Sequence, residues 1–449
     1  MTQDNQRMYQ DKQLTADQAV RLVRSFDRIY YGEFSLFPQA LDRALCQWLR
    51  EGDIRDVTIE SVCLTREPRA LAHEETRNRV DVQDWHFSAL SRRLHDQGLC
   101  SYKPLTYHQG PRIIRKYEDY DVVFLTTTPM GPRGNFNFGL CNSVSSAALD
   151  KAKKIVVEVN PSVPKCLGGN QESIHISRVT HVVEADNDPI LEIPAADPTP
   201  EDEKIARLLL PEIENGACLQ LGIGGLPNVV GRLLAESGLK DLGIHTEMLV
   251  DSFVDLYEQG KITGAHKVVD RYKMAYTFAM GTRKLYDFLD ENPDCASYPV
   301  DYINHPRFIG MNPKVVAINN AIEVDLFSQV ASESIGPRQI SGTGGQLDFI
   351  LGAFYSKGGK GIICLSSTFT DKNGVRASRI VPALSPGTIV TVPRSLVHYV
   401  ATEYGIVQLK GRSVWERAEA LIGIAHPDFR EDLIRQAENL GIWQRSNRK

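Results

Sequence analysis

Segments typical of short buried strands alternate with segments typical of amphipathic helices along most of the chain. Residues 15–25 carry apolar side chains at helical spacing, and an apolar, strand-like stretch follows at 28–31. Apolar runs at 121–125 and 154–159 enclose a predicted helix over 143–152. Strands that alternate with helices are typical of a parallel sheet with helices on both faces. The sequence therefore predicts an α/β fold built on open, doubly wound sheets.

The same opening pattern recurs in the second half of the chain. After an acidic, proline-containing stretch, a predicted helix is followed by a strand and then by Gly222, just as a helix and a strand near the N-terminus are followed by Gly32. The recurrence predicts two similar α/β domains, 1–190 and 204–449, joined by an exposed linker over 191–203. The other predicted elements are a helix over 201–215, a helix from about 228, strands at 247–250, 315–319, 361–366 and 388–392, and a helical stretch over 413–440 with a break at Pro427.

Charge and composition exclude several classes of protein. The net charge is −5, from 51 Lys and Arg against 56 Asp and Glu, so the basic excess of a nucleic-acid binder is missing. No apolar run reaches the roughly 18 residues of a membrane span, and the polar N-terminus is unlike a signal peptide. The eight cysteines form no CxxC pair and no cluster with histidines, which argues against a zinc site. We expect a cytoplasmic protein with reduced thiols and no metal, nucleic-acid or membrane partner.

Two glycine-rich segments can hold an anion with their backbone. Leu221-Gly-Ile-Gly-Gly-Leu-Pro-Asn228 follows a predicted strand and precedes a helix, whose first N–H groups can face a ligand. Pro227 stands where a dinucleotide-binding GxGxxG segment has its third glycine, so that motif is a poor match. Ile340-Ser-Gly-Thr-Gly-Gly-Gln-Leu-Asp348 is the second such segment. A plain strand-to-helix turn explains either segment alone, but two of them favour binding of an oxyanion or a pyrophosphate.

Glu247 lies in an otherwise apolar, strand-like run over 243–251. A buried carboxylate is costly unless it is paired, so a salt bridge at the end of a strand is one explanation and a functional role is the other. His245 and Asp251 are ambiguous in the same way. The chain has no GxSxG motif and no P-loop, which disfavours serine hydrolysis and ATP hydrolysis. A carboxylate together with two glycine loops suits acyl transfer through a glutamyl intermediate.

A series of motifs in a fixed order is more specific than either glycine loop. With these motifs, nearly the whole chain resembles the acetyl-CoA hydrolase/transferase family of CoA-transferases, and within it the butyryl-CoA:acetate and 4-hydroxybutyrate CoA-transferases. The resemblance is dense from about 121 onward and thinner before 120. The motifs are Gly222-Ile-Gly-Gly-Leu-Pro-Asn, Gly243-Ile-His-Thr-Glu-Met, Val300-Asp-Tyr-Ile-Asn, Ser332-Glu-Ser-Ile-Gly, Ile340-Ser-Gly-Thr-Gly-Gly-Gln-Leu-Asp-Phe, Ser378-Arg-Ile-Val-Pro, His398-Tyr-Val-Ala-Thr-Glu-Tyr-Gly and Ile424-Ala-His-Pro-Asp-Phe-Arg.

The resemblance implies two related α/β domains of the CoA-transferase (NagB/RpiA-like) fold, with the active site between them. It implies that Glu247 is the nucleophile and carries CoA as a glutamyl thioester in a ping-pong reaction. It also implies coenzyme A as a co-substrate rather than a resident cofactor, short-chain carboxylic acids as the other substrates, and a homo-oligomer, either a dimer or a tetramer. The residues that it places in contact with CoA are Gly222, Ile223, Gly224, Gly225, Leu226, Ile322, Gly345 and Lys372.

The N-terminal half leaves the acid substrate open. Phe26 stands where the family has a glycine before the first strand, and this half is expected to help shape the acyl pocket. Arg66 and Arg69 motivate a dicarboxylate such as itaconate or succinate, since a second carboxylate needs a cationic partner. Solvated surface arginines are the alternative explanation. A thioester hydrolase, in which water is the acceptor, and a non-catalytic CoA-binding protein are further alternatives.

Overall fold

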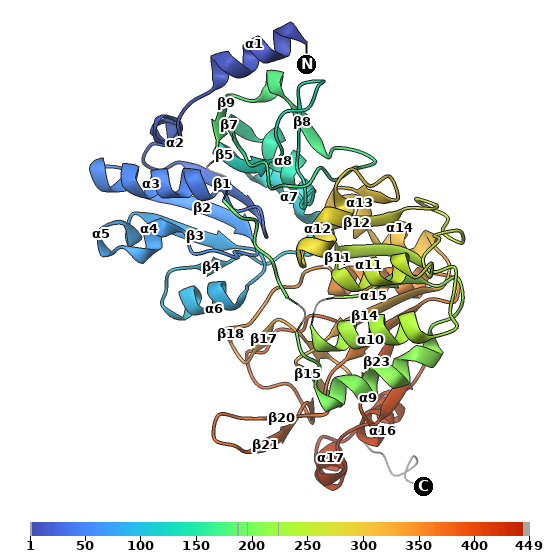
Figure 1. The fold of residues 1–449 in the computed structure, drawn as a ribbon. Coiled ribbons are helices and arrows are strands. Elements are labelled where there is room, and N and C mark those ends of the chain that lie inside the picture. The colour runs from blue at the N-terminus through green and yellow to red at the C-terminus, as the bar shows by residue number, and fades with distance from the viewer. Residues whose placement is uncertain (1, 186–187, 195, 223, 443–449) are drawn as a thin grey trace. The chain divides into compact units, whose positions relative to one another are not determined.

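The computed structural model describes residues 2–185, 188–194, 196–222 and 224–442, and the chain divides into two units by its internal contacts (Figure 1). The predicted boundaries at 190 and 204 stay a prediction, because a division by contacts does not test independent folding. The first unit comprises Met1–Pro194, Glu247–Leu249 and Ala275–Ile303, and the second comprises Ala195–Thr246, Val250–Met274 and Asn304–Lys449.

The first sheet is parallel, and its first strand is central. Its order is β4-β3-β2-β1-β5-β7-β9, so the chain builds outward from β1 to one side and then to the other. Because parallel crossovers are right-handed, this reversal places helices on both faces. The strands are β1 (Arg28–Glu33), β2 (Val57–Val62), β3 (Val80–Asp84), β4 (Ser101–Tyr102), β5 (Tyr120–Thr127), β7 (Ala152–Val159) and β9 (His181–Glu184).

The second sheet repeats this order. Within the described residues it runs β13-β12-β11-β10-β14-β19-β23-β24, again with the first strand between later ones and with one extra antiparallel strand, β24, at the edge. The prediction of two similar doubly wound sheets is confirmed. The strands are β10 (Cys218–Gln220), β11 (Gly243–Leu249), β12 (Met274–Ala279), β13 (Cys295–Ser297), β14 (Val315–Asn320), β19 (Lys360–Cys364), β23 (Tyr399–Thr402) and β24 (Gly405–Gln408).

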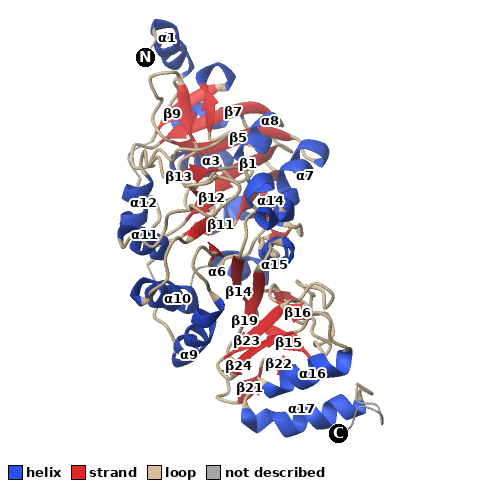
Figure 2. Cartoon of the chain, turned by 90° about the vertical axis from the view of Figure 1, so that its right-hand side faces the viewer, coloured by secondary structure: helices blue, strands red, loops and turns tan. Residues whose placement is uncertain are grey.

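Helices cover the sheets, and each unit has its own apolar core. In the second unit α9 lies beside α10 (Figure 1), and α16 lies beside α17 near the C-terminal end of the described chain (Figure 2). The main helices are α1 (Gln3–Lys12), α2 (Ala16–Ala19), α3 (Gln39–Glu51), α4 (Arg69–Ala72), α5 (Glu74–Arg77), α6 (Ala89–Asp96), α7 (Gly110–Tyr117), α8 (Ser145–Asp150), α9 (Pro200–Leu209), α10 (Gly225–Glu236), α11 (Asp251–Glu258), α12 (Arg283–Leu289), α14 (Pro306–Met311), α15 (Gln346–Tyr355), α16 (Val414–Gly423) and α17 (Pro427–Asn439).

One predicted element is wrong, and several end earlier than predicted. Residues 388–392 form no strand, and only an isolated bridge joins Val392 to Val330. Gly387 and Pro393 enclose this apolar run and keep it too short for a ladder. The helix predicted over 201–215 ends at Leu209, before Pro211. The break predicted at Pro427 is confirmed, because α16 and α17 are separate helices.

Phe26 and Gly216 occupy equivalent turns before the central strands of the two sheets. Their φ angles are 71° and 75°, in the left-handed region that favours glycine. Phe26 donates its N–H to the carbonyl of Arg55 (3.1 Å), and Gly216 donates to that of Lys240 (3.0 Å). The first unit therefore makes this turn with phenylalanine and the second unit makes it with glycine. Phe26, whose side chain is 71% exposed, is the residue with the strained backbone.

We expect Phe26→Gly to raise the free energy of unfolding by up to about 1 kcal/mol. A left-handed conformation costs an L-residue roughly 1–2 kcal/mol, and the larger chain entropy of glycine in the unfolded state offsets part of the gain. Denaturant unfolding measures the change. As a control, Gly216→Ala is expected to destabilise, because its β-carbon would also lie 2.8 Å from Cδ2 of His266. A clear loss of stability in Phe26→Gly would contradict the assignment of strain.

Candidate active site

The loops that carry the predicted CoA contacts begin at one edge of the second sheet. β10, β14 and β19 are parallel neighbours, so their carboxyl ends meet at the same edge. The amide of Asn319 donates to Oε1 of Gln220 (3.0 Å), which joins the ends of β14 and β10. The side-chain amide of Gln346, the first residue of α15, donates to the carbonyl of Asn320 (3.0 Å). These bonds bring both glycine loops, 221–225 and 341–345, to this edge.

The first glycine loop leaves its backbone open to a ligand. Gly224 has a φ of 116°, and a β-carbon at Gly222 or Gly224 would meet no atom within 4 Å. Gly225 begins α10, and its β-carbon would lie 2.5 Å from Oδ2 of Asp202. Leu226 is buried, so its side chain serves the core. Among the described residues, no N-cap side chain accepts a hydrogen bond from the first turn of α10. Ile223 lies outside the described residues.

The second glycine loop needs glycine at a position that the sequence did not single out. Gly344 has a φ of 51°, whereas Gly345 has a φ of −97°, which other residues also adopt. Gly345 precedes α15, and no side chain caps that helix. The hydroxyl of Thr343 donates to Oε2 of Glu333 (3.2 Å), which fixes the loop from its side.

The two remaining predicted CoA contacts follow β14 and β19. Ile322 is half-buried, and its carbonyl accepts a hydrogen bond from Nη1 of Arg379 (2.9 Å). Lys372 is exposed in the turn between β20 (Thr368–Thr370) and β21 (Arg376–Ser378), an antiparallel hairpin that comes after β19. An exposed lysine on a hairpin turn can reach a phosphate without a desolvation cost.

Glu247 lies near the end of β11, directly after a residue that touches the first glycine loop. β11 pairs in parallel with β10, and the hydroxyl of Thr246 lies 3.5 Å from the carbonyl oxygen of Leu221. Glu247 is half-buried and belongs by its contacts to the first unit. Glu247 is therefore the residue of β11 that directly follows the contact between this strand and the loop.

A buried acid, Glu33, ends the central strand of the first sheet. Its carboxylate accepts hydrogen bonds from the thiol of Cys141 (3.5 Å), the N–H of Val144 (3.4 Å) and the hydroxyl of Ser145 (3.4 Å). Burial raises the pKa of Glu33 to about 7, and hydrogen bonds from neighbours that include the Ser143 hydroxyl only partly offset this effect. The sequence analysis missed Glu33, although it shows the same pattern as Glu247, an acid at the end of an apolar strand.

A cavity of about 440 Å³ in the first unit brings the two predicted arginines together. Nη2 of Arg66 donates to the carbonyl of Pro189 (3.4 Å), and Arg69 is exposed. Arg43 also lines the cavity and pairs with Asp188 (2.8 Å). The carboxylates of Asp42 and Glu67 line the same cavity, so its lining carries both signs of charge.

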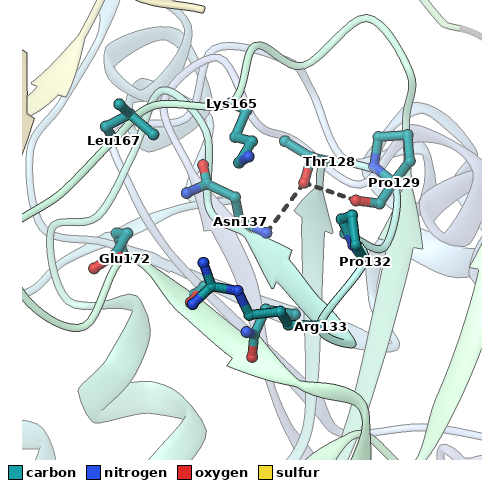
Figure 3. A pocket seen from close by; sticks show the side chains of 11 residues that line it. Thr128, Pro129, Pro132, Arg133, Asn137, Lys165, Leu167 and Glu172 are labelled. Atoms are coloured by element: carbon teal, nitrogen blue, oxygen red, sulfur yellow. Dashed lines mark hydrogen bonds between the residues drawn. The ribbon is translucent and has the colours of Figure 1, made fainter. Parts of the chain in front are cut away.

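A second cavity in the first unit, of about 300 Å³, is lined mainly by polar residues at the end of β5 (Figure 3). The hydroxyl of Thr128 donates to the carbonyl of Pro129 (3.0 Å) and accepts the N–H of Asn137 (3.1 Å). Its cations are Arg133, which is exposed, and Lys165, which pairs with Glu291 (2.7 Å). None of the residues predicted to bind CoA lines this cavity.

Among the described residues, no group of three or more His, Cys, Asp or Glu side chains is arranged to hold a metal ion. In the same part of the chain, each helix is too short or too polar to cross a membrane.

Comparisons with known proteins cover almost the whole chain. Residues 1–194 match the family model of the acetyl-CoA hydrolase/transferase N-terminal domain, and residues 281–437 match that of the C-terminal domain. A butyryl-CoA:acetate CoA-transferase from Anaerostipes caccae is 48% identical over 98% of this chain and 99% of its own length. A 4-hydroxybutyrate coenzyme A transferase from Clostridium kluyveri is 37% identical over 96% and 98%. The crystal structure of RipA from Yersinia pestis is 36% identical, covers 98% of this chain and 100% of its own, and has a TM-score of 0.89.

The buried acids of the first unit predict that stability falls as the pH rises. Burial raises the pKa of Glu158 on β7 from 4.5 to about 7, as it does for Glu33. Because the folded chain holds these protons while the unfolded chain has lost them, the free energy of unfolding decreases between about pH 4.5 and 7. Each acid contributes up to about 3 kcal/mol, at 1.36 kcal/mol per pH unit.

Denaturant unfolding at pH 5 and pH 7.5 measures this slope. We expect Glu158→Gln to flatten the slope, because glutamine does not ionise, while its oxygen still accepts the N–H of Leu41 that Glu158 accepts at 2.9 Å. The same slope in the variant and in the unmodified protein would show that Glu158 is ionised in both the folded and the unfolded state.

Proposed function

The chain belongs to the acetyl-CoA hydrolase/transferase family and is a CoA-transferase, and we propose that it moves CoA from a short-chain acyl-CoA to a free carboxylate through a thioester on Glu247. The observation that carries this proposal is the position of Glu247 on β11, directly after Thr246, which contacts the first glycine loop. The activities of the relatives from Anaerostipes caccae and Clostridium kluyveri favour butyryl-CoA, acetate and 4-hydroxybutyrate as substrates.

The reaction has two mirrored halves. The Glu247 carboxylate attacks the thioester carbonyl of the donor, CoA thiolate leaves, and a mixed acyl-glutamyl anhydride forms. The thiolate then attacks the glutamyl carbonyl, which releases the donor acid and leaves CoA bound to Glu247 as a thioester. The acceptor carboxylate reverses these steps. A carboxylate is a sufficient nucleophile, since each step exchanges activated acyl groups of similar energy.

The glycine loops supply binding and charge stabilisation in this proposal. Backbone N–H groups at the starts of α10 and α15, next to Gly224 and Gly345, are suited to the oxyanions and to the phosphates of CoA. Lys372, on the exposed hairpin turn, would contact a CoA phosphate as a point charge. Gly222, Gly225, Leu226 and Ile322 belong to the same edge and complete the proposed CoA contacts. Coenzyme A enters as a co-substrate, and these steps need no resident cofactor.

We expect enzyme incubated with acyl-CoA alone to accumulate a covalent adduct on Glu247. Borohydride treatment should then inactivate the enzyme, and peptide mass spectrometry should place the reduced side chain at Glu247. Steady-state kinetics with donor and acceptor varied together should give parallel lines, because the donor acid leaves before the acceptor attacks. Glu247→Gln should lose essentially all transfer activity. Glu247→Asp should be slowed on the order of 10²-fold, because the attacking oxygen is displaced by about 1 Å.

Three other acids of the chain, Asp251, Glu323 and Glu333, serve as controls. None of the three should carry the label after borohydride treatment. An active Glu247→Gln variant with intersecting-line kinetics would refute the mechanism. Release of CoA at the same rate with and without added carboxylate would instead identify a thioester hydrolase.

The cavity lined by Arg43, Arg66 and Arg69 favours a second candidate function, a CoA-transferase whose acid substrate is a dicarboxylate such as succinate or itaconate. The second carboxylate needs a cation, and the half-buried Arg66 and the exposed Arg69 both line this cavity. Arg43 already pairs with Asp188, so Arg66 and Arg69 are the better partners.

We expect Arg66→Ala or Arg69→Ala to raise the KM for succinate more than the KM for butyrate if the acid substrate is a dicarboxylate. Loss of a hydrogen bond to a charged group, about 1.5–3 kcal/mol, corresponds to roughly a 10- to 150-fold increase. Initial-rate kinetics with both acids measure the difference, and Arg43→Ala serves as the control. Equal changes for the two acids would exclude a role for this cavity in dicarboxylate recognition.

A further inference from the structure

Glu33 is connected by side chains to the phenol of Tyr107. The hydroxyl of Tyr107, a residue of the short 3-10 helix η2 (Tyr107–Gln109), is hydrogen-bonded to the hydroxyl of Ser143. Ser143 in turn is a hydrogen-bond partner of the Glu33 carboxyl. All three side chains are buried, and all belong to the first unit. Water therefore does not compete for these hydrogen bonds, and each hydroxyl takes its orientation from its neighbour.

β12, which carries Phe278, lies beside β11, which carries Glu247. The N–H of Met280 donates to the carbonyl of Leu249 (3.2 Å), a bond that in a parallel ladder sets Ala279 opposite Leu249. Two residues back along each strand, Thr277 lies opposite Glu247, and Phe278 is the next residue of β12. On its other edge β12 forms an antiparallel bridge from Phe278 to Cys141.

The ring of Phe278 contacts the ring of Tyr107 and the ring of Phe34, the residue after Glu33. It stacks on the ring of Phe34 with 3.8 Å between ring centroids. It also meets the ring of Tyr107 edge-on at 6.4 Å. The negative charge of Glu247 is close enough to add to the effect of burial and of Glu33 on the pKa of Tyr107. The phenol of Tyr107 thus lies near the proposed nucleophile.

The backbone of Ser143 is held in a conformation that serine rarely adopts. Its φ is 38°, in the left-handed region, and such strain persists only where surrounding contacts hold the residue in place. Here the N–H of Ser143 donates to the carbonyl of Thr277 (3.2 Å), and the carbonyl of Ser143 accepts the N–H of Val300 (2.9 Å). These two backbone hydrogen bonds hold Ser143 in place, with its hydroxyl between Glu33 and Tyr107.

We propose that Glu33 is a positioning residue whose carboxylic acid, through Ser143, turns the hydroxyl of Tyr107 toward Glu247. There the phenol donates a hydrogen bond to the oxygen that becomes negatively charged when the glutamyl carbonyl is attacked. This inference rests on the proposed role of Glu247. Every residue that it uses belongs to the first unit.

The direction of the hydrogen bonds depends on the proton of Glu33. A neutral Glu33 donates to Ser143, Ser143 donates to Tyr107, and the phenol proton is then free to point toward Glu247. When Glu33 loses its proton to solvent, Ser143 donates to the carboxylate and Tyr107 donates to Ser143, so the phenol offers Glu247 only lone pairs. Only the hydroxyl groups rotate, and no other proton leaves the chain.

The other groups that face this chain keep their protons at neutral pH. They are Tyr30 on β1, which faces Glu33, together with Cys141 and Tyr107 itself. Burial, followed by the charge of Glu33, raises the pKa of Tyr30, Cys141 and Tyr107 well above the ordinary values. The charge of Glu247 adds a smaller effect that also raises the pKa of Tyr107. Burial raises the pKa of Glu33 to about 7, so its titration reverses the hydrogen bonds within the neutral range.

The test compares the pH dependence of kcat in the full-length enzyme and in three variants. In the unmodified enzyme, we expect kcat to fall as the pH rises from 6 to 8, with an apparent pKa near 7. Tyr107→Phe should lower kcat at pH 6 on the order of 10- to 100-fold and leave the KM for acyl-CoA within about threefold, and its deficit should shrink as the pH rises. Glu33→Gln should abolish the fall near pH 7. Glu158→Gln removes an equally buried acid that also titrates near 7, and its pH profile should match that of the unmodified enzyme.

A purely structural role for Tyr107 would give a deficit that is independent of pH. That result, or an unchanged kcat in Tyr107→Phe, would overturn the proposal even if Glu33→Gln failed to fold. Mass spectrometry of the CoA adduct separates the two levels of inference. If the unmodified enzyme forms no adduct on Glu247, the proposed function fails and this inference fails with it. If the adduct forms and the pH profiles of Tyr107→Phe and the unmodified enzyme are parallel, this inference alone is wrong.

Discussion

Parallel pairing brings Glu33 and both glycine loops to the carboxyl ends of strands. In a parallel sheet every strand ends at the same edge, so residues far apart in the sequence meet there without a long loop. The bond between Gln220 and Asn319 and the bond from Gln346 to Asn320 show this for the second sheet, where two glycine loops about 120 residues apart share one edge. Glu33 obeys the same rule at the end of β1. The shared strands have the same order in both sheets, but the chemical groups at this edge differ between them.

The two edges differ in the kind of hydrogen-bonding group that they offer. The second sheet presents main-chain N–H groups at the starts of α10 and α15, which are suited to negative charge and do not titrate. The first sheet presents side chains, namely a buried acid and the hydroxyls of Ser143 and Tyr107, whose donors depend on a proton. Burying Glu33 costs free energy above its ordinary pKa, and so does burying Glu158. Glu158 accepts a hydrogen bond from the N–H of Leu41 near the start of α3 and so helps to hold that helix. The hydroxyls next to Glu33 instead connect its carboxyl group to the phenol of Tyr107.

The sequence predicted the architecture better than the details of the site. Strand and helix periodicity is a property of many residues, so the two doubly wound sheets followed from it. A single apolar run between Gly387 and Pro393 had no such support, and the strand predicted at 388–392 was wrong. Phe26 shows a further limit, because its left-handed backbone was marked in the sequence only by a glycine at the equivalent turn, Gly216. Gly344 was overlooked beside Gly345 because the residue types in a glycine run do not say which one has a positive φ.

Glu33, Ser143 and Tyr107 escaped sequence analysis for a physical reason. They lie more than 30 residues apart from one another, and tertiary contacts that include the pairing of residues 140–143 with β12 bring them to one place. In the proposed mechanism, their arrangement meets a requirement that backbone N–H groups of the glycine loops alone do not meet. Two oxyanions form in that mechanism, one on the carbonyl oxygen of the substrate thioester and the other on the carbonyl oxygen of Glu247. A donor fixed on the glycine loops is suited to the first, and a donor fixed beside Glu247 is suited to the second. Since the phenol of Tyr107 is buried, a neutral partner such as protonated Glu33 can orient it without adding a negative charge that would repel the developing oxyanion.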